Sequence, residues 1–307
     1  MMVLCYHKVG DTKKDWDGVV TSRGTFIKQL SYLKENYGFI SPAEALSKTS
    51  SKGVLLTFDD GAEDNYLNVL PIIEELEVPA LFFVMTETLE RKCETWINEL
   101  IWLFMEGNEY PPYIVLEIEG MVYEYATSTS EERTRAYCEI LKKLVGSSLQ
   151  TRDNVMEVIR KWAEKERRVG RMSHLMLSRN QLKEMSESRY VTIGCHTVTH
   201  RSLGKLDYQE QYNEINSSKK VLESIIEKKI EQFAYPFGGP TDYDVSTIEI
   251  LKDLEFRCAY STTYKRKSLS FSQYEIPRVC INECSMDDFI AKFDFYKNKE
   301  SYYYSVF

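Results

Sequence analysis

Short apolar runs recur along this chain, and segments with helical signals lie between them. Runs of this kind, rich in β-branched and aromatic residues, are typical of parallel strands that are buried on both faces. The seven runs are residues 3–6, 54–58, 80–85, 191–195, 232–235, 258–261 and 276–281. A strand followed by a helix, repeated about seven times, favours an α/β fold with a distorted βα barrel over an antiparallel fold.

Helix starts between the runs are marked by capping boxes. In each box, a serine or aspartate that can cap a helix is followed three residues later by a glutamate or glutamine that can bond back to it. The boxes are residues 41–44, 178–181 and 207–210. We therefore expect helices to begin at these three places.

The alternation of strands and helices is interrupted between about residues 87 and 177. This segment contains an aromatic-rich run with Trp96, Trp102 and Phe104, a Pro111-Pro112 break, a candidate hairpin at Glu119-Gly120 and a charged helical stretch. We interpret the chain as a single barrel domain over residues 1–307 with a mostly helical insertion or subdomain at about 87–177.

The composition limits the partners that this chain can have. It has 307 residues, of which 43% are hydrophobic and 28% charged, as in an ordinary globular protein with a sizeable core. The net charge of −8 argues against nucleic acid or an anionic membrane surface as the main partner. No stretch approaches the ~18 apolar residues of a membrane span, so no transmembrane segment is expected.

The start of the chain and its cysteines bear on its location. Residues 1–7 have no basic region before an apolar core, so no secretory signal is predicted. The seven cysteines are scattered without a C-x-x-C pair, which argues against a disulfide framework or a cysteine zinc site. We expect reduced thiols, several of them in core strands, in a cytoplasmic protein that is in solution or peripheral to the membrane.

A pair of adjacent aspartates follows the run 54–58. In a strand, Asp59 and Asp60 would point to opposite faces, and both can face one site only if the chain turns at once, which Gly61 permits. Barrel enzymes place catalytic groups at this end of their strands. The alternative is an acidic turn in which one aspartate caps the next helix.

Two histidines, His196 and His200, follow the run 191–195 directly. Histidines four residues apart face the same side if the segment turns helically, as metal-binding pairs do. With Asp60 as a third ligand, they would hold a divalent metal and leave one position open for water. The alternative is a pair of surface or core histidines, although the chain has only four histidines in all.

A third strand end, residues 233–239, is a turn rich in proline and glycine. Backbone N–H groups in such a turn could point into a site and stabilise an oxyanion. Taken alone, the segment needs no explanation beyond a simple turn.

Together, the three motifs resemble those of the polysaccharide deacetylases, the family of the NodB homology domain, also called carbohydrate esterase family 4. T-F-D-D-G at 57–61, H-T-x-x-H at 196–200 and the turn at 236–239 stand in the order of that family. The resemblance implies a distorted (β/α)7 barrel and a hydrolase. Family members remove N- or O-acetyl groups from chitin, peptidoglycan or poly-N-acetylglucosamine, usually with zinc.

The resemblance also implies a role for each matching residue. Asp59 matches the catalytic base, and Asp60, His196 and His200 match the metal ligands. Phe237 matches the residue whose backbone N–H contributes to the oxyanion site. The expected metal is zinc, with Co²⁺, Ni²⁺ or Mn²⁺ as alternatives because an Asp-His-His set accepts several divalent ions.

Two positions depart from the family pattern. Ala234 stands where an arginine usually braces the catalytic aspartate, and no histidine follows His200 to serve as the C-terminal catalytic acid. Residues 5–9 resemble the Y-H-x-[IV] start of a branch that includes the poly-N-acetylglucosamine deacetylases, in which an early histidine is the acid. The resemblance therefore implies His7 as the acid, and Arg278 is a candidate for the missing brace. The alternatives are a histidine bonded to backbone at a strand end and a purely structural ion pair.

We therefore predict a metal-dependent hydrolase that removes N-acetyl groups from an amino sugar, as a glycan, an oligosaccharide or a lipid- or nucleotide-linked intermediate. One alternative is a non-catalytic glycan-binding protein on a deacetylase scaffold, and another is a metal-dependent hydrolase of a different amide. Tyr235 and the tryptophans of the insertion could stack on sugar rings, although such aromatic residues are more often part of a core.

Overall fold

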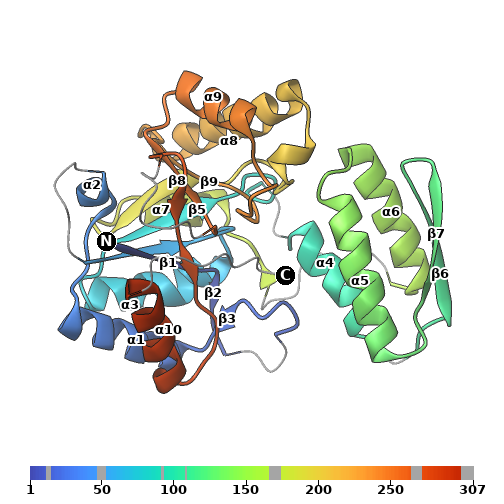
Figure 1. Ribbon diagram of the computed structural model, residues 1–307, viewed down its shortest axis with the longest axis horizontal. Coiled ribbons are helices and arrows are strands. Elements are labelled where there is room, and N and C mark those ends of the chain that lie inside the picture. Colours follow the sequence, from blue (N-terminus) through green and yellow to red (C-terminus); the bar gives the residue numbers. More distant parts are fainter. Residues whose placement is uncertain are drawn as a thin grey trace. The chain divides into compact units, whose positions relative to one another are not determined.

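The computed structural model describes residues 1–11, 15–46, 53–90, 93–107, 109–165, 174–263 and 272–298. The chain forms two compact units, one made of Met1–Arg91 and Met176–Phe307 and the other of Lys92–Leu175 (Figure 1). All the candidate catalytic and metal-binding residues lie in the first unit.

A parallel sheet forms the centre of the first unit. The strand order is β11-β10-β9-β8-β5-β4-β1-β12, and every pair of neighbours is parallel. The strands are β1 (Met2–Tyr6), β4 (Val54–Phe58), β5 (Ala80–Val84), β8 (Val191–Cys195), β9 (Gln232–Ala234), β10 (Cys258–Ser261), β11 (Ile276–Pro277) and β12 (Val279–Cys280). All seven predicted runs therefore form strands. β2 (Lys8–Val9) and β3 (Val20–Thr21) make a separate short pair.

The last strand closes this sheet into a barrel. β11 pairs with β10, β12 pairs with β1, and only Arg278 separates β11 from β12. Residues 276–280 therefore hydrogen-bond to both edge strands of the sheet. The sheet closes into a ring of seven strands, in which β11 and β12, interrupted only by Arg278, count as one strand. The predicted distorted (β/α)7 barrel is confirmed.

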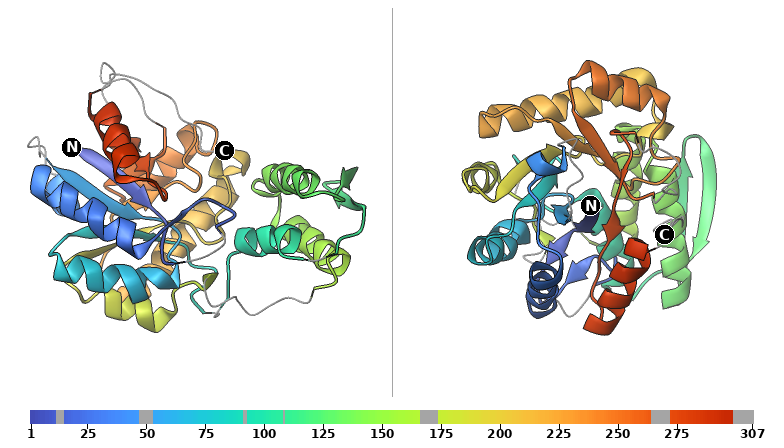
Figure 2. Two further views of the ribbon diagram at one scale, coloured as in Figure 1. Left: turned by 90° about the horizontal axis from the view of Figure 1, so that it is seen from below. Right: turned by 60° about the vertical axis from the view of Figure 1, so that its left-hand side comes forward.

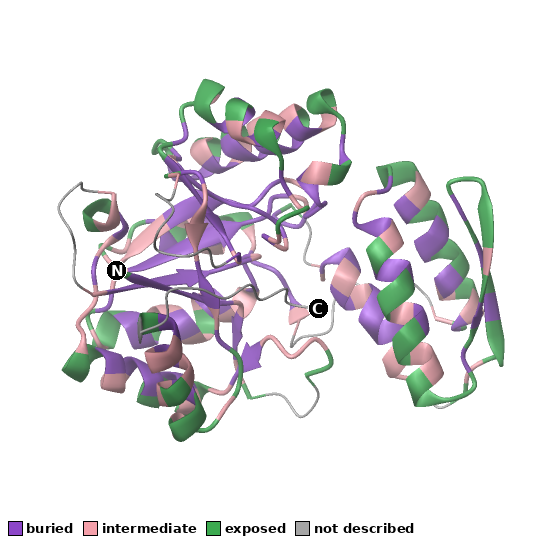
Figure 3. Ribbon diagram, viewed as in Figure 1, coloured by how far each residue is buried: buried purple, intermediate pink, exposed green. Residues whose placement is uncertain are grey.

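Successive residues of the strands alternate between the inside of the ring and its outer layer. One cluster packs inside the ring and includes Val3, Leu55, Leu81, Phe83, Ala234 and Tyr260. The residues between them, such as Leu4, Leu56 and Phe82, pack with the helices outside. The strands are consequently buried on both faces, as Figure 3 shows, which explains their continuous apolar sequence.

Helices surround the strands of the first unit (Figure 2). They are α1 (Arg23–Asn36), α2 (Pro42–Ala45), η1 (Asn65–Val69), α3 (Leu70–Glu75), α7 (Arg179–Met185), η3 (Leu203–Lys205), α8 (Tyr208–Ile226), α9 (Val245–Asp253) and α10 (Met286–Asn298). The three predicted capping boxes are present, at Ser41, Ser178 and Asp207. Among the described residues, no helix combines the length and the apolar composition that crossing a membrane requires.

The second unit consists of helices and one hairpin. Its elements are α4 (Trp96–Met105), β6 (Tyr113–Ile118), β7 (Met121–Ala126), α5 (Ser130–Leu144) and α6 (Leu149–Trp162). The predicted hairpin turns at Glu119 and Gly120, which both have positive φ angles. Trp96 and Trp102 are only 7% and 6% exposed, so these tryptophans are core residues and not platforms for a sugar ring.

Candidate active site

The candidate residues stand at the carboxyl ends of the parallel strands, where barrels carry their active sites. His7 follows β1, Asp59 and Asp60 follow β4, His196 and His200 follow β8, Phe237 follows β9, and Arg278 interrupts the last strand. The fold thus brings residues from the whole length of the first unit to one rim of the ring.

The two aspartates are separated by a sharp turn at the end of β4. Asp60 and Gly61 have φ angles of 71° and 82°, in the left-handed region. A Cβ atom at Gly61 would lie 2.8 Å from a methyl group of Val84, so glycine is required there for space as well as for conformation. Because of this turn, Asp59 and Asp60 reach different partners.

Asp60 forms a group with the two histidines. Its Oδ1 atom lies 3.5 Å from Nε2 of His196 and 3.3 Å from Nε2 of His200. The three ligand atoms all lie within 4.8 Å of one another. Burial opposes ionisation of Asp60, but the two neighbouring histidines hold its pKa well below the usual value.

This group fits a divalent cation. Nδ1 of His196 lies 2.8 Å from the carbonyl oxygen of Ala234, so a neutral imidazole donates there and turns its Nε2 lone pair toward Asp60. Among the described residues, the buried Oδ1 atom of Asp60 has no hydrogen-bond partner of normal geometry. One carboxylate and two imidazoles that converge in this way supply three ligands that a divalent cation accepts.

The segment that carries the histidines is a bent loop and not the helical turn that their spacing predicted. Thr197 and His200 have φ angles of 64° and 57°, which no α-helix contains. The side-chain hydroxyl of Thr197 accepts a hydrogen bond of 3.1 Å from the backbone N–H of His200. The histidines converge on Asp60 because of this loop conformation.

Glu214, on α8, holds the histidine loop in place. Its buried carboxylate accepts hydrogen bonds from the backbone N–H groups of Val198 and Thr199 at 3.0 and 2.9 Å. It also accepts the Thr199 hydroxyl at 2.5 Å and pairs with Arg201 at 3.3 Å. The role of Glu214 was not predicted from the sequence. The available signal was a stripe of polar residues at helical spacing, Gln211, Glu214 and Ser218, on the face of a helix expected to be buried.

Asp59 is bound by Arg278. The guanidinium donates two hydrogen bonds, of 2.6 Å to Oδ1 and 2.7 Å to Oδ2, and both residues are buried. The Cys5 thiol donates a longer one to Oδ2, at 3.4 Å. Burial would raise the pKa of Asp59, but the charge and the hydrogen bonds of Arg278 outweigh it and lower the pKa below the usual value. Asp59 is therefore an ionised carboxylate at neutral pH.

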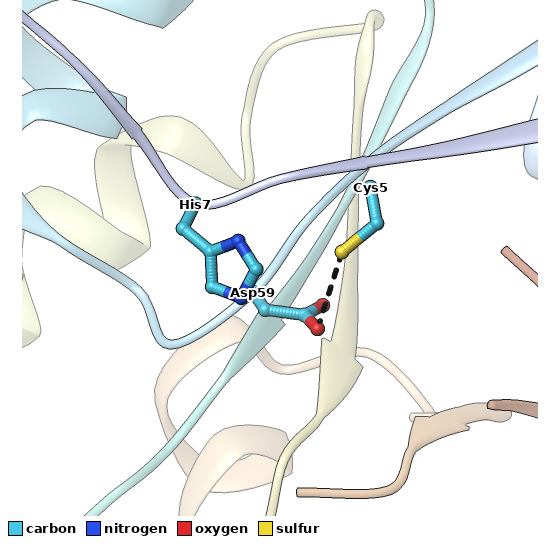
Figure 4. A group of neighbouring side chains, drawn as sticks. All are labelled: Cys5, His7 and Asp59. Atoms are coloured by element: carbon cyan, nitrogen blue, oxygen red, sulfur yellow. Dashed lines mark hydrogen bonds between the residues drawn. The ribbon is translucent and has the colours of Figure 1, made fainter. Parts of the chain in front are cut away.

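His7 lies beside Asp59 (Figure 4). Ligand atoms of Cys5, His7 and Asp59 all lie within 4.8 Å of one another. The backbone carbonyl of His7 accepts a 3.0 Å hydrogen bond from Asn65, at the start of η1. Its buried Nδ1 atom has no partner among the residues that the structure describes. The strand-end position thus brings an imidazole next to the carboxylate.

Phe237 and Tyr235 follow β9 but have different surroundings. Phe237 has a φ of 61°, and its ring packs edge-on against His200 with the ring centres 4.7 Å apart. Tyr235 is fully buried, stacks on Tyr243, and donates its hydroxyl to the carbonyl of Tyr274. The idea that Tyr235 stacks on a sugar ring is therefore wrong, because its alternate position in the strand directs it into the outer core.

Fold and site together define the class of protein. A (β/α)7 barrel with an Asp-His-His group and a second, arginine-bound carboxylate at one rim has the architecture of a hydrolase of the deacetylase type. Residues 47–259 match the family model described as polysaccharide deacetylase, and the chain belongs to this family. It is thus an enzyme, a carbohydrate deacetylase of the hydrolase class, as predicted.

Individual relatives are distant. The chain is 20% identical over 287 residues to YxkH of Bacillus subtilis, a match that covers 91% of this chain and 71% of that protein. It is 23% identical over 133 residues to the poly-β-1,6-N-acetyl-D-glucosamine N-deacetylase of Staphylococcus aureus, which covers 41% of this chain and 45% of that enzyme. The solved structure of IcaB from Ammonifex degensii has the same fold, with a TM-score of 0.58 and 20% identity over 96% of both chains.

Proposed function

We propose that this chain is a metal-dependent N-deacetylase of an N-acetylated amino sugar. The observation that carries the proposal is that two adjacent carboxylates lie in two different groups of side chains. Asp59 lies with Arg278 and His7, whereas Asp60 lies with His196 and His200. Metal-assisted hydrolysis of an acetamide uses a general base and a set of metal ligands, and the two carboxylates of this turn can serve one in each role.

Asp60, His196 and His200 would hold the metal. The unpartnered Oδ1 atom of Asp60 and the orientation of the His196 ring support this assignment. When bound, a divalent cation polarises the acetamide carbonyl and lowers the pKa of water. Zinc suits two imidazoles and one carboxylate, and Co²⁺, Ni²⁺ and Mn²⁺ are the alternatives to test.

Asp59 would be the general base. Its Oδ1 atom accepts one hydrogen bond from Arg278 among the described residues, and a carboxylate oxygen has two lone pairs. The second lone pair can take the proton of the attacking water. Arg278 donates a hydrogen bond to each oxygen of Asp59 and so fixes the orientation of the carboxylate, as the arginine of the family pattern would.

His7 would be the general acid. An amide anion is a very poor leaving group, so the sugar nitrogen must receive a proton as the C–N bond breaks. His7 is beside Asp59, at the same rim of the barrel, so it is within reach of the bond that Asp59 helps to break. The backbone N–H of Phe237 is the proposed donor to the oxyanion.

The position of His7 also bears on the alternative of a glycan-binding protein on a decayed scaffold. The motive for that alternative was the missing C-terminal histidine and the missing brace. His7 and Arg278 both lie against Asp59, so each absent group has a replacement at the site. This geometry favours a working enzyme.

Acetate release from N-acetylglucosamine oligomers, with zinc and with a chelator, tests the proposal. Asp59→Asn should lower kcat by about 10²- to 10⁴-fold and leave zinc content unchanged. Asp60→Asn, one residue away, should lose zinc and activity together. Full activity in Asp59→Asn would exclude it as the base. If N-acetyl sugars were inert while another amide was cleaved with zinc, the substrate assignment would be wrong.

The substrate class comes from the family and the chemistry of the site. The staphylococcal relative is named for poly-β-1,6-N-acetyl-D-glucosamine, so β-1,6-linked oligomers are the first substrates to assay, followed by lipid- and nucleotide-linked N-acetyl sugars. The cytoplasmic location stays a prediction, which cell fractionation would test.

A further inference from the structure

A second group of potential metal ligands lies beside the Asp60 group and shares no residue with it. It consists of Cys5, His7 and Asp59, which offer one sulfur, one nitrogen and one oxygen atom within 4.8 Å of one another (Figure 4). Thiolate, imidazole and carboxylate are the three ligand types that zinc accepts in proteins. The sequence alone did not indicate this group, because 54 positions separate Cys5 from Asp59 and only one cysteine is involved.

Two side chains of the group have atoms that bear on cation binding. The buried Nδ1 atom of His7, one of its two possible ligand atoms, has no hydrogen-bond partner in the part of the chain that the structure describes. The thiol of Cys5 points at Oδ2 of Asp59, 3.4 Å away, so that a single proton lies between the sulfur and the oxygen. A metal ion that replaces this proton keeps both atoms satisfied.

Burial disfavours the thiolate form of Cys5, which is the form that binds a metal ion. Arg278 neutralises Asp59 through two hydrogen bonds, so the pair carries no net charge. Burial raises the pKa of Cys5 well above that of a free thiol, a hydrogen bond with Cys280 adds to this effect, and the charge of Arg278 opposes it. A bound dication would stabilise the thiolate.

We propose that Cys5, His7 and Asp59 form a second, inhibitory site for a thiophilic divalent cation such as Zn²⁺ or Cd²⁺. On binding, the S–H bond of Cys5 breaks, a sulfur–metal bond forms, and the proton leaves to solvent, with no change in oxidation state. Neutral His7 contributes its lone pair and Asp59 a carboxylate oxygen. The inhibition, but not the binding, rests on the proposed function, since an ion here occupies both the base and the acid.

Cadmium titration tests the binding without any assay of activity, because a cadmium–thiolate bond absorbs in the near ultraviolet and a bond to nitrogen or oxygen does not. The protein should carry Cys93→Ser and Cys138→Ser to remove thiols of the second unit. It should then show thiolate absorption that Cys5→Ser abolishes, with the loss of one equivalent of bound cadmium. Cys258→Ser, a change at another buried strand cysteine, should leave both unchanged.

Two further variants separate this site from the Asp60 group. His200→Ala should lose the equivalent bound by Asp60 and keep the thiolate absorption. His7→Ala retains the sulfur and should weaken cadmium uptake at the second site at least tenfold, which gives a test even if Cys5→Ser fails to fold. Thiolate absorption that persists in Cys5→Ser, or depends on Cys280 instead, would overturn the assignment.

Activity provides the second readout. The rate of acetate release should rise with the first equivalent of zinc and fall as excess zinc is added. Each variant is compared with its own maximum rate, and in Cys5→Ser the zinc concentration that halves the rate should be at least tenfold higher. Equal inhibition in both proteins would contradict the proposal. An absence of deacetylation at every zinc concentration would refute the proposed function and leave the cadmium result standing.

Discussion

Arg278 binds both carboxylate oxygens of Asp59, at 2.6 and 2.7 Å, although 219 positions separate the two residues in the chain. The arginine comes from the strand that closes the barrel, and the aspartate follows β4. Because the pair is buried, the free energy of unfolding and the basicity of Asp59 both depend on this contact.

Removal of this arginine should destabilise the protein strongly. Arg278→Met leaves Asp59 as an unpaired buried charge, which costs about 3–5 kcal/mol of unfolding free energy. The double variant Arg278→Met with Asp59→Asn should recover part of that loss, because no buried charge then lacks a partner. Urea denaturation measures both. An equal loss in the single and double variants would show that packing, and not charge, is responsible.

The histidine loop should depend on Glu214. Glu214→Gln keeps the size of the side chain but replaces one acceptor oxygen by a donor. Either the Val198 and Thr199 amides, which share Oε2, lose their acceptor, or Arg201 loses its contact with Oε1. We expect a loss of about 1–3 kcal/mol of unfolding free energy and a 10- to 100-fold weaker affinity for zinc.

The matched control for Glu214→Gln is Glu210→Gln. Glu210 also pairs with Arg201 and lies on the same helix, whereas the amides of Val198 and Thr199 donate to Glu214. Competition with a chromophoric chelator measures the zinc affinity. If both variants bound zinc equally well, Glu214 would have no part in positioning the ligands.

Asp64 should make the stability depend on pH. Burial raises its pKa to about 6, even though the Val9 amide and the charge of Lys8 act in the opposite direction. The unfolded chain releases this proton at about pH 4. The stabilising contribution is therefore complete below about pH 4 and is lost as the pH rises through about 6.

Asp64→Asn is the informative variant for this pH dependence, because its amide oxygen can still accept the hydrogen bond of the Val9 amide while the side chain cannot ionise. Between pH 4 and 7 the wild type should lose roughly 2 kcal/mol of unfolding free energy relative to Asp64→Asn. Asp153→Asn, at a carboxylate whose side chain is 65% exposed, is the control. A constant difference in unfolding free energy between the wild type and Asp64→Asn across this range would contradict the prediction.

Removal of divalent metal should lower the melting temperature. An ion that binds only the folded state stabilises it by about 4 kcal/mol at a thousand times its Kd. Addition of zinc to the chelator-treated protein should raise the melting temperature, and His200→Ala should lose most of that rise. His174→Ala changes a histidine outside both ligand groups and should keep it. If zinc raised the melting temperature of His200→Ala as much as that of the wild type, His200 would not be a metal ligand.

The strands could be predicted because each is a short apolar run that is buried on both faces. The sequence also indicated Asp60, His196 and His200 as a group, and the structure brings their ligand atoms together. The conformation of the histidine loop could not be predicted, because Glu214 of a later helix imposes it through contacts with backbone atoms. The spacing of the two histidines alone favoured a helical turn, because residues four apart face the same side of a helix.

Side-chain direction was the other point that spacing did not reveal. Tyr235 alternates with Ala234, which faces the inside of the ring, so Tyr235 turns outward into the core. Side chains alternate along the strand, so Ala234 and Tyr235 must face opposite sides. The sequence does not show which of the two sides is the inside of the barrel. The same limit applied to Cys5, whose neighbour Asp59 is set by the register of β1 and β4.

The closing strand also has a consequence for a chain that is still being synthesised. A nascent chain that ends at residue 263 already contains Asp59, Asp60 and both histidines, but it has neither residues 276–280 nor Arg278. In that fragment, β1 and β10 are the open edges of a sheet, and open edges can pair with strands of other molecules. Addition of the last strand to such a fragment would therefore cover both open edges and supply the partner of Asp59 in one step.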